Sequence, residues 1–81
     1  MTLVTLYGKP GCCLCDEAKQ VVDDVRARTP FELEEIDITR DPGLERTYRE
    51  RIPVIAIDGD EAFELQLDAS ELEERLARVA P

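Results

Sequence analysis

The stretch that decides the fold is Leu3–Lys19, which reads LVTLYGKPGCCLCDEAK. It opens with the apolar run Leu3–Tyr7, which predicts a buried strand. Glycine and proline in Gly8–Gly11 interrupt this run, and a helical pattern follows. The chain has three cysteines and no histidine, so all its thiol chemistry lies between the strand and the helix. A C-x-x-C pair at such a junction is typical of a redox site and indicates thiol–disulfide exchange.

Cys12 and Cys15 are the redox couple that the spacing favours. Residues three apart on a helix lie about 5–6 Å apart, within the range that a disulfide bridges. A bridge from Cys12 to its neighbour Cys13 would be strained, and Cys13 and Cys15 point to different faces. Cys12 comes before the first helical turn, where free N–H groups, the helix dipole and nearby Lys9 stabilise a thiolate. Cys15 lies one turn further in, so we expect Cys12 to be the nucleophile and Cys15 the resolving thiol.

Cys13 is an extra thiol whose role the sequence leaves open. It could be a buried filler, an incidental surface thiol or a functional group. The alternative that all three cysteines are small core hydrophobes is disfavoured, because glycine, proline and lysine flank the cluster.

The rest of the chain predicts the element order βαβαββα in one domain over residues 1–81, an α/β core followed by a hairpin and a closing helix. After the first strand we expect a helix over Cys13–Arg28, with apolar positions Ala18, Val21, Val22 and Val25, and then a strand over Phe31–Ile38. A short helix opened by Asp41-Pro42 follows, with Leu44 and Tyr48 on its inner face, and after it a central strand over Val54–Ile57. A turn at Asp58–Asp60 leads to a half-exposed strand through Phe63, Leu65 and Leu67, and the chain closes with a helix that has the capping box Ser70–Glu73 and the apolar stripe Leu72, Leu76 and Val79. The alternation slips near Glu34-Glu35, which predicts a bulge or an edge strand there.

A second feature is Arg51-Ile52-Pro53, directly before the central strand. Proline at this place is unusual because it removes a donor from the sheet. A cis Ile52-Pro53 bond would turn the chain sharply and leave the backbone groups of Ile52 free to pair with a bound peptide or thiol. An ordinary trans proline at a strand start is the alternative, and the spacing alone does not choose between them.

Composition excludes several function classes. The net charge is −9, and all the excess acid lies in residues 32–81. This balance argues against binding to nucleic acid or to anionic lipid, because both need clustered lysine and arginine. No secretory signal and no stretch of membrane-spanning length is visible, so we expect a location in the reducing cytoplasm.

The stretch Leu6–Lys19 resembles the opening strand and K-P-x-C-x-x-C active site of the glutaredoxin branch of the thioredoxin superfamily. Its Cys-Leu-Cys-Asp-Glu-Ala variant is similar to short bacterial glutaredoxin-like proteins, as is the run from Ile36 to Val54 with its Arg51-Ile52-Pro53-Val54 segment. The resemblance spans nearly the whole chain. It implies a thioredoxin/glutaredoxin-like fold, α/β, with a mixed four-stranded sheet, and it favours the cis form of Ile52-Pro53.

The resemblance also implies functional residues. Cys12 and Cys15 are the expected catalytic pair, and Pro53 is expected to face them. The surface expected to contact the substrate comprises Lys9, Cys13, Leu14, Arg51, Ile52 and Pro53. Typical glutaredoxins hold glutathione with a glycine pair before the last helix, whereas this chain has Leu67-Asp68-Ala69-Ser70-Glu71 there.

Three functions remain in competition. The first is a monomeric thiol–disulfide oxidoreductase that acts on protein or low-molecular-weight disulfides without a cofactor, with glutathione or a thioredoxin-reductase-type system as reductant. The second is a carrier of copper, zinc or an iron–sulfur cluster, although a closed tetrahedral site would lack a fourth ligand in a monomer. The third is an interaction module that has kept the fold without catalysis.

Overall fold

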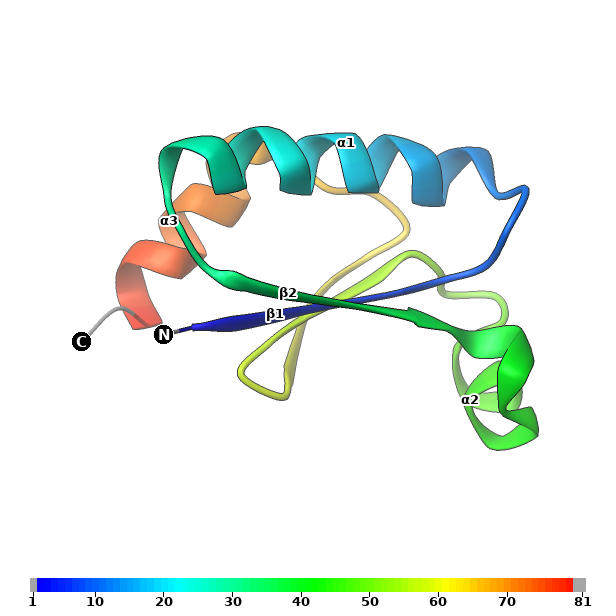
Figure 1. Ribbon diagram of the computed structural model, residues 1–81. Helices are drawn as coiled ribbons and strands as arrows, with labels where there is room; N and C mark the ends of the chain where they lie inside the picture. Colours follow the sequence, from blue (N-terminus) through cyan, green and yellow to red (C-terminus); the bar gives the residue numbers. More distant parts are fainter. Residues whose placement is uncertain (1, 80–81) are drawn as a thin grey trace.

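The computed structural model describes residues 2–79 and contains one mixed sheet with helices packed around it (Figure 1). The element order βαβαββα is confirmed. The elements are β1 (Leu3–Gly8), α1 (Cys13–Arg28), β2 (Glu32–Asp37), the 3-10 helix η1 (Ile38–Arg40), α2 (Pro42–Tyr48), β3 (Val54–Ile57), β4 (Asp60–Glu64) and α3 (Ala69–Val79).

The four strands lie in the order β2-β1-β3-β4. β1 pairs with β2 in parallel, and the other two pairings are antiparallel. β2 is therefore an edge strand. Of the two causes predicted for the irregular alternation at Glu34-Glu35, the edge position is the one found, because the register of β2 with β1 continues without a bulge from Glu32 to Asp37. The sheet irregularity lies instead between Ile55 and Ala56, where β3 pairs with β4.

Helices α1 and α3 lie on one face of the sheet, and α2 lies beyond the carboxyl ends of β1 and β2 (Figure 1). The main core between the sheet and α1 and α3 is formed by Val4, Leu6, Ala18, Val22, Val25, Phe31, Ile55, Ile57, Leu72 and Leu76. A second, smaller core contains Cys15, Ile38 and Ile52, with Leu44 and Tyr48 of α2 packed against it. The predicted inner face of α2 is thus confirmed, and this second core places α2 next to the cysteines.

One predicted turn and one predicted helix cap form as expected from their local chemistry. Asp58 and Gly59 both have positive φ, 51° and 90°, as the tight hairpin between β3 and β4 requires. The Asp41 carboxylate accepts hydrogen bonds from the N–H groups of Gly43 at 2.8 Å and Leu44 at 3.4 Å, and it thereby caps α2, whose first residue is Pro42.

The chain before α3 differs from the prediction. β4 ends at Glu64, and Leu65 has φ 70° and a side chain that is 45% exposed, so the strand does not continue through Leu67. The predicted capping box Ser70–Glu73 is wrong, because the carboxylate of Asp68 accepts the N–H of Ser70 at 2.8 Å and the helix starts at Ala69. Leu72 and Leu76 form the predicted buried stripe, whereas the Val79 side chain lies outside the described part of the structure.

Candidate active site

Cys12 is the N-cap residue of α1. Gly11, with φ 79°, turns the chain from β1 toward the helix, and Cys12 has an extended backbone with φ −93°. The Cys12 carbonyl accepts the first helical hydrogen bond from Asp16 N–H at 3.0 Å, and its Sγ accepts one from Cys15 N–H at 3.3 Å. The partly exposed sulfur therefore lies at the positive end of a sixteen-residue helix, where a negative charge is stabilised.

Cys15 is in a different environment. Its side chain is only 7% exposed and packs against Ile38 and Ile52. Burial, supported by a side-chain hydrogen bond with Cys12, raises the pKa of the Cys15 thiol to about 11. Gly8 leaves room for this sulfur, because a Cβ at Gly8 would lie 3.0 Å from Cys15 Sγ. Cys15 thus remains a thiol at neutral pH.

Cys13 and Leu14 point outward between these two cysteines. Cys13 is exposed, so it is a surface thiol and not a core filler. Leu14 is 40% exposed, which is unusual for a large apolar side chain and leaves it available to a partner.

The Ile52-Pro53 peptide bond is cis, as the resemblance implied. Both side chains are buried, and Ile52 shares the small core with Cys15. The expectation that the backbone groups of Ile52 are free is wrong for its N–H, which donates to the carbonyl of Tyr48 at 3.1 Å. The Pro53 carbonyl accepts the N–H of Leu65 at 2.9 Å, which ties the chain before α3 to this segment.

Arg51 is held by two carboxylates and an aromatic ring. Its guanidinium forms an ion pair with Glu61 and donates from Nε to Glu64 at 2.6 Å. It also lies 5.4 Å from the ring centroid of Tyr48, which stacks on Tyr7 with centroids 4.5 Å apart. The positive charge of Arg51 is therefore already compensated within the chain, so it is a weaker partner for a substrate carboxylate than the sequence suggested.

This group of Tyr7, Tyr48, Arg51, Glu61 and Glu64 was not found from the sequence. The Tyr48 hydroxyl donates to Glu61 at 3.1 Å, and burial raises the pKa of this tyrosine. The hydrogen bond from Arg51 lowers the pKa of the Glu61 carboxyl. The spacing Glu61-x-x-Glu64 could have indicated two carboxylates near Arg51. Such a prediction would first have required the register of the β3–β4 hairpin.

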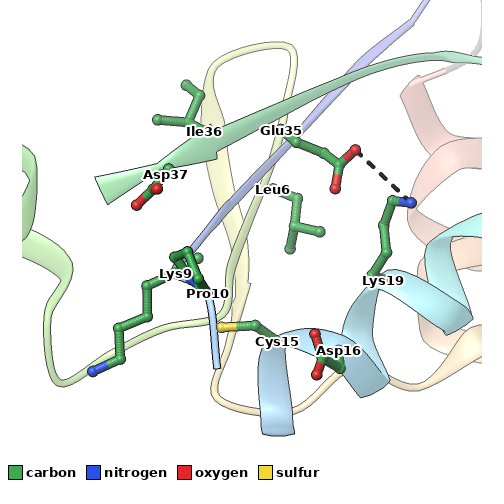
Figure 2. Close-up of a pocket in the computed structure, with 10 residues that line it drawn as sticks. Leu6, Lys9, Pro10, Cys15, Asp16, Lys19, Glu35, Ile36 and Asp37 are labelled. Carbon is green, nitrogen blue, oxygen red and sulfur yellow. Dashed lines mark ion pairs between the residues drawn. The ribbon is translucent and has the colours of Figure 1, made fainter. Parts of the chain in front are cut away.

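A groove of about 370 Å³ opens beside Cys15, between α1 and the ends of β1 and β2 (Figure 2). Figure 2 shows the Cys15 sulfur directed toward the backbone at Lys9-Pro10, and the Lys9 side chain extended away from it. Lys19 and Glu35 form an ion pair of 3.8 Å on the other side of the groove. The Lys9 side chain therefore does not contact the buried sulfur, whereas the Lys9 backbone forms a hydrogen bond with Cys15 that partly offsets the rise in the pKa of this thiol.

The described residues also bear on metal-ion sites and on membrane-spanning helices. Within residues 2–79, no three histidine, cysteine, aspartate or glutamate side chains are grouped so that they could hold a metal ion. None of the helices in the described part of the chain is long and apolar enough to cross a bilayer.

Comparison with known proteins finds a family model and individual relatives that match most of this chain. The family model that matches residues 3–77 is described as a glutaredoxin-like domain (DUF836). A relative from Mycobacterium tuberculosis, "Uncharacterized protein Rv0508", is 28% identical over 80 residues, which cover 93% of this chain and 82% of the relative.

Solved structures share the fold of this chain. Protein XcR50 from X. campestris has a TM-score of 0.80 and 29% identity, with 96% of this chain and 99% of that chain covered. Protein Ne2328 from Nitrosomonas europaea has a TM-score of 0.78 and 29% identity, with coverage of 91% and 89%. A mutant thioredoxin from Halobacterium salinarum has a TM-score of 0.72 at 19% identity, with coverage of 99% and 78%, and shows that the fold is shared with thioredoxin. Fold and family together support a redox-type role.

Proposed function

Since this chain belongs to the glutaredoxin-like domain family, we propose that it is a thiol–disulfide oxidoreductase with Cys12 and Cys15 as its dithiol. The observation that carries the proposal is the difference between the two sulfurs. Cys12 is accessible and caps a long helix, whereas Cys15 is buried three residues away with a pKa of about 11. A two-step exchange needs an accessible nucleophile and a second thiol that stays protonated until the mixed disulfide has formed.

In the first step, the Cys12 thiolate attacks one sulfur of the substrate disulfide. The S–S bond of the substrate breaks, its other sulfur leaves as a thiolate that takes up a proton, and a mixed disulfide to Cys12 forms. In the second step, Cys15 loses its proton to solvent and attacks the Cys12 sulfur, which releases the second thiol. The substrate gains two electrons, and the protein keeps a Cys12–Cys15 disulfide that an external thiol reductant must reduce.

The environment of Cys15 suits this order of events. Part of the rise in its pKa comes from the hydrogen bond and the electrostatic repulsion of Cys12. In the mixed disulfide the Cys12 sulfur is bonded to the substrate and carries no charge that could repel a Cys15 thiolate. The resolving thiol is therefore easier to ionise when it is needed than in the resting dithiol.

We also propose that glutathione is a poor reductant for this protein and that another thiol system serves it in a reducing compartment such as the cytoplasm. The chain before α3 contains no glycine pair, and Leu65 and Asp68 stand in that region. Arg51 already binds Glu61 and Glu64 and so offers little attraction to a glutathione carboxylate. Without fixed donors, glutathione reaches Cys12 in the productive direction less often, and an error of about 1 Å can cost on the order of a hundredfold in rate.

Reduction of a small neutral disulfide by the fully reduced protein tests the proposed dithiol. The wild type should release two thiols per protein and end with a Cys12–Cys15 disulfide. Cys12→Ser should abolish the reaction, Cys15→Ser should accumulate the mixed disulfide, and Cys13→Ser, which keeps the dithiol, should still form the intramolecular bridge. Peptide mapping after oxidation that finds a Cys12–Cys13 bridge, or full activity in Cys12→Ser, would overturn the proposal. With glutathione as sole reductant, turnover equal to that with a thioredoxin-reductase-type system would contradict the choice of reductant.

A further inference from the structure

Two exposed leucines flank a hollow beside the reactive cysteines. Among the side chains that the structure describes, Leu14 and Leu65 are the large apolar ones classed as exposed, at 40% and 45%. Both line one small hollow, which we call the apolar slot, together with Glu17, Ala18, Gln66 and Leu67. No cysteine lines the slot, but Leu14 lies in the first turn of α1, two residues after Cys12, so the slot begins within one helical turn of the reactive sulfur.

The position of Leu65 is fixed by the backbone. Its N–H donates to the Pro53 carbonyl at 2.9 Å and to the Arg51 carbonyl at 3.2 Å. Its φ of 70° lies in the left-handed region, which glycine and asparagine adopt readily and leucine adopts rarely. Leu65 is therefore exposed and lines the slot together with residues in the first turns of α1. The segment between β4 and α3 passes close to α1 in the fold (Figure 1).

The size and charge of the apolar slot limit what can occupy it. Its volume is about 180 Å³, below the roughly 300 Å³ at which sites for whole small ligands begin. It therefore suits one side chain of a larger partner. Glu17 is the one charged residue among the six that line it, and the protein as a whole carries a charge of −9. A partner with a cationic residue near its apolar one is favoured, and an anionic ligand such as glutathione is disfavoured.

We propose that the apolar slot binds an aliphatic side chain next to the reacting cysteine of a polypeptide disulfide, with a basic side chain of the same segment near Glu17. This inference rests on the proposed function and names its substrate class as basic, apolar protein disulfides. The exchange itself is unchanged: Cys12 attacks the substrate sulfur, and the reduced dithiol supplies both electrons. The slot orients the substrate so that its sulfur meets Cys12.

The test compares the single-turnover cleavage of peptide disulfides by the reduced protein. Each probe consists of two identical fluorophore-labelled peptides joined through their single cysteine, so cleavage relieves quenching. In the first probe leucine and arginine flank the cysteine, in the second serine replaces leucine, and in the third glutamate replaces arginine. The wild type should cleave the first probe on the order of tenfold faster than the second, because only leucine buries apolar area in the slot. It should cleave the third roughly twofold to fivefold more slowly than the first, and less so at high salt.

Variants of the slot distinguish binding from general reactivity. Leu65→Asn removes the apolar side chain but accepts the left-handed backbone, so the fold is retained, and the preference for leucine over serine should disappear. Glu17→Lys should remove the preference for arginine over glutamate. Glu34→Lys, which makes the same charge reversal on the exposed edge strand β2, is the matched control and should keep both preferences.

The outcomes separate this inference from the proposed function. A wild type that cleaves a small neutral disulfide but treats leucine and serine probes alike overturns the slot while the oxidoreductase proposal stands. Retention of the leucine preference in Leu65→Asn does the same. If the reduced protein cleaves neither the small disulfide nor any peptide, the oxidoreductase proposal fails and the slot inference fails with it.

Discussion

The burial of Cys15 makes protein stability depend on pH in a defined window. The folded structure raises the pKa of this thiol from 9.0 to about 11. The unfolded chain therefore releases this proton at lower pH than the folded chain does, and deprotonation favours unfolding. The stabilising contribution is fully present below pH 9 and is lost as the pH rises through 11. Since one pKa unit corresponds to about 1.4 kcal/mol, the free energy of unfolding should fall by roughly 3 kcal/mol from this group.

Urea unfolding of the reduced wild type and of Cys15→Ala, at pH values from about 8 to 11, measures this contribution. Cys15→Ala has a lower free energy of unfolding because of its small cavity, and this decrease does not depend on pH. The variant lacks the titrating thiol, so it shows no pH dependence from this group. Tyr48, whose pKa is also raised by burial, titrates in both proteins and cancels in the difference. The stability advantage of the wild type should therefore shrink by roughly 2 kcal/mol by pH 11, where the folded thiol is half ionised. Cys13→Ala, which removes an exposed thiol, should follow the wild type.

The same reasoning predicts reactivity. At pH 7 a thiol with a pKa of about 11 is ionised in about one molecule in ten thousand, a hundredfold less than a thiol with a pKa of 9.0. Cys15 should therefore react with iodoacetamide at least about a hundredfold more slowly than an unburied thiol. Two results would refute the argument: a parallel loss of stability in the wild type and Cys15→Ala across the same pH range, or labelling of Cys15 as fast as Cys13.

Two further substitutions test how the site and its flanking helix are built. Gly8→Ala places a methyl group 3.0 Å from the Cys15 sulfur, so it should lower the free energy of unfolding in urea by about 1–3 kcal/mol. It should also slow the release of the substrate thiol from the mixed disulfide. Wild-type values for both would show that the Cys15 sulfur has room to move. Asp68→Ala should lower the free energy of unfolding by about 1 kcal/mol because it removes the cap of α3, whereas Ser70→Ala should change it little; the reverse order would restore the capping box predicted from the sequence.

Local patterns were sufficient for the order of elements and for the roles suggested for the two cysteines. The apolar run Leu3–Tyr7, the break after it and the helical spacing from Cys13 onward each depend on neighbours within a few residues. The same holds for Asp41 and for the turn at Asp58, where side-chain and backbone preferences act over two or three positions. The position of Cys12 at a helix N-terminus followed from the same local information.

Features that depend on strand register could not be predicted in this way. The two carboxylates that bind Arg51 are ten and thirteen residues away, and they reach it only because the β3–β4 hairpin has one particular pairing. The early end of β4 at Glu64 has the same origin, since the Leu65 N–H pairs with Pro53 and Arg51 and leaves the strand. At α3, two residues able to cap a helix lie close together, and the path of this segment selects Asp68 over Ser70.

These long-range contacts shape the surface on which the proposed preference for another reductant than glutathione rests. The ion pairs of Arg51 with Glu61 and Glu64 compensate a cation that a glutathione carboxylate would need, and the same hairpin end turns Leu65 outward next to Leu14. β4 and the turn that follows it therefore compensate the charge of Arg51 and place an apolar side chain on the surface. Because the reactive sulfur at the start of α1 does not depend on that segment, specificity can change from a small anionic thiol to an apolar, basic polypeptide without any change in the dithiol chemistry.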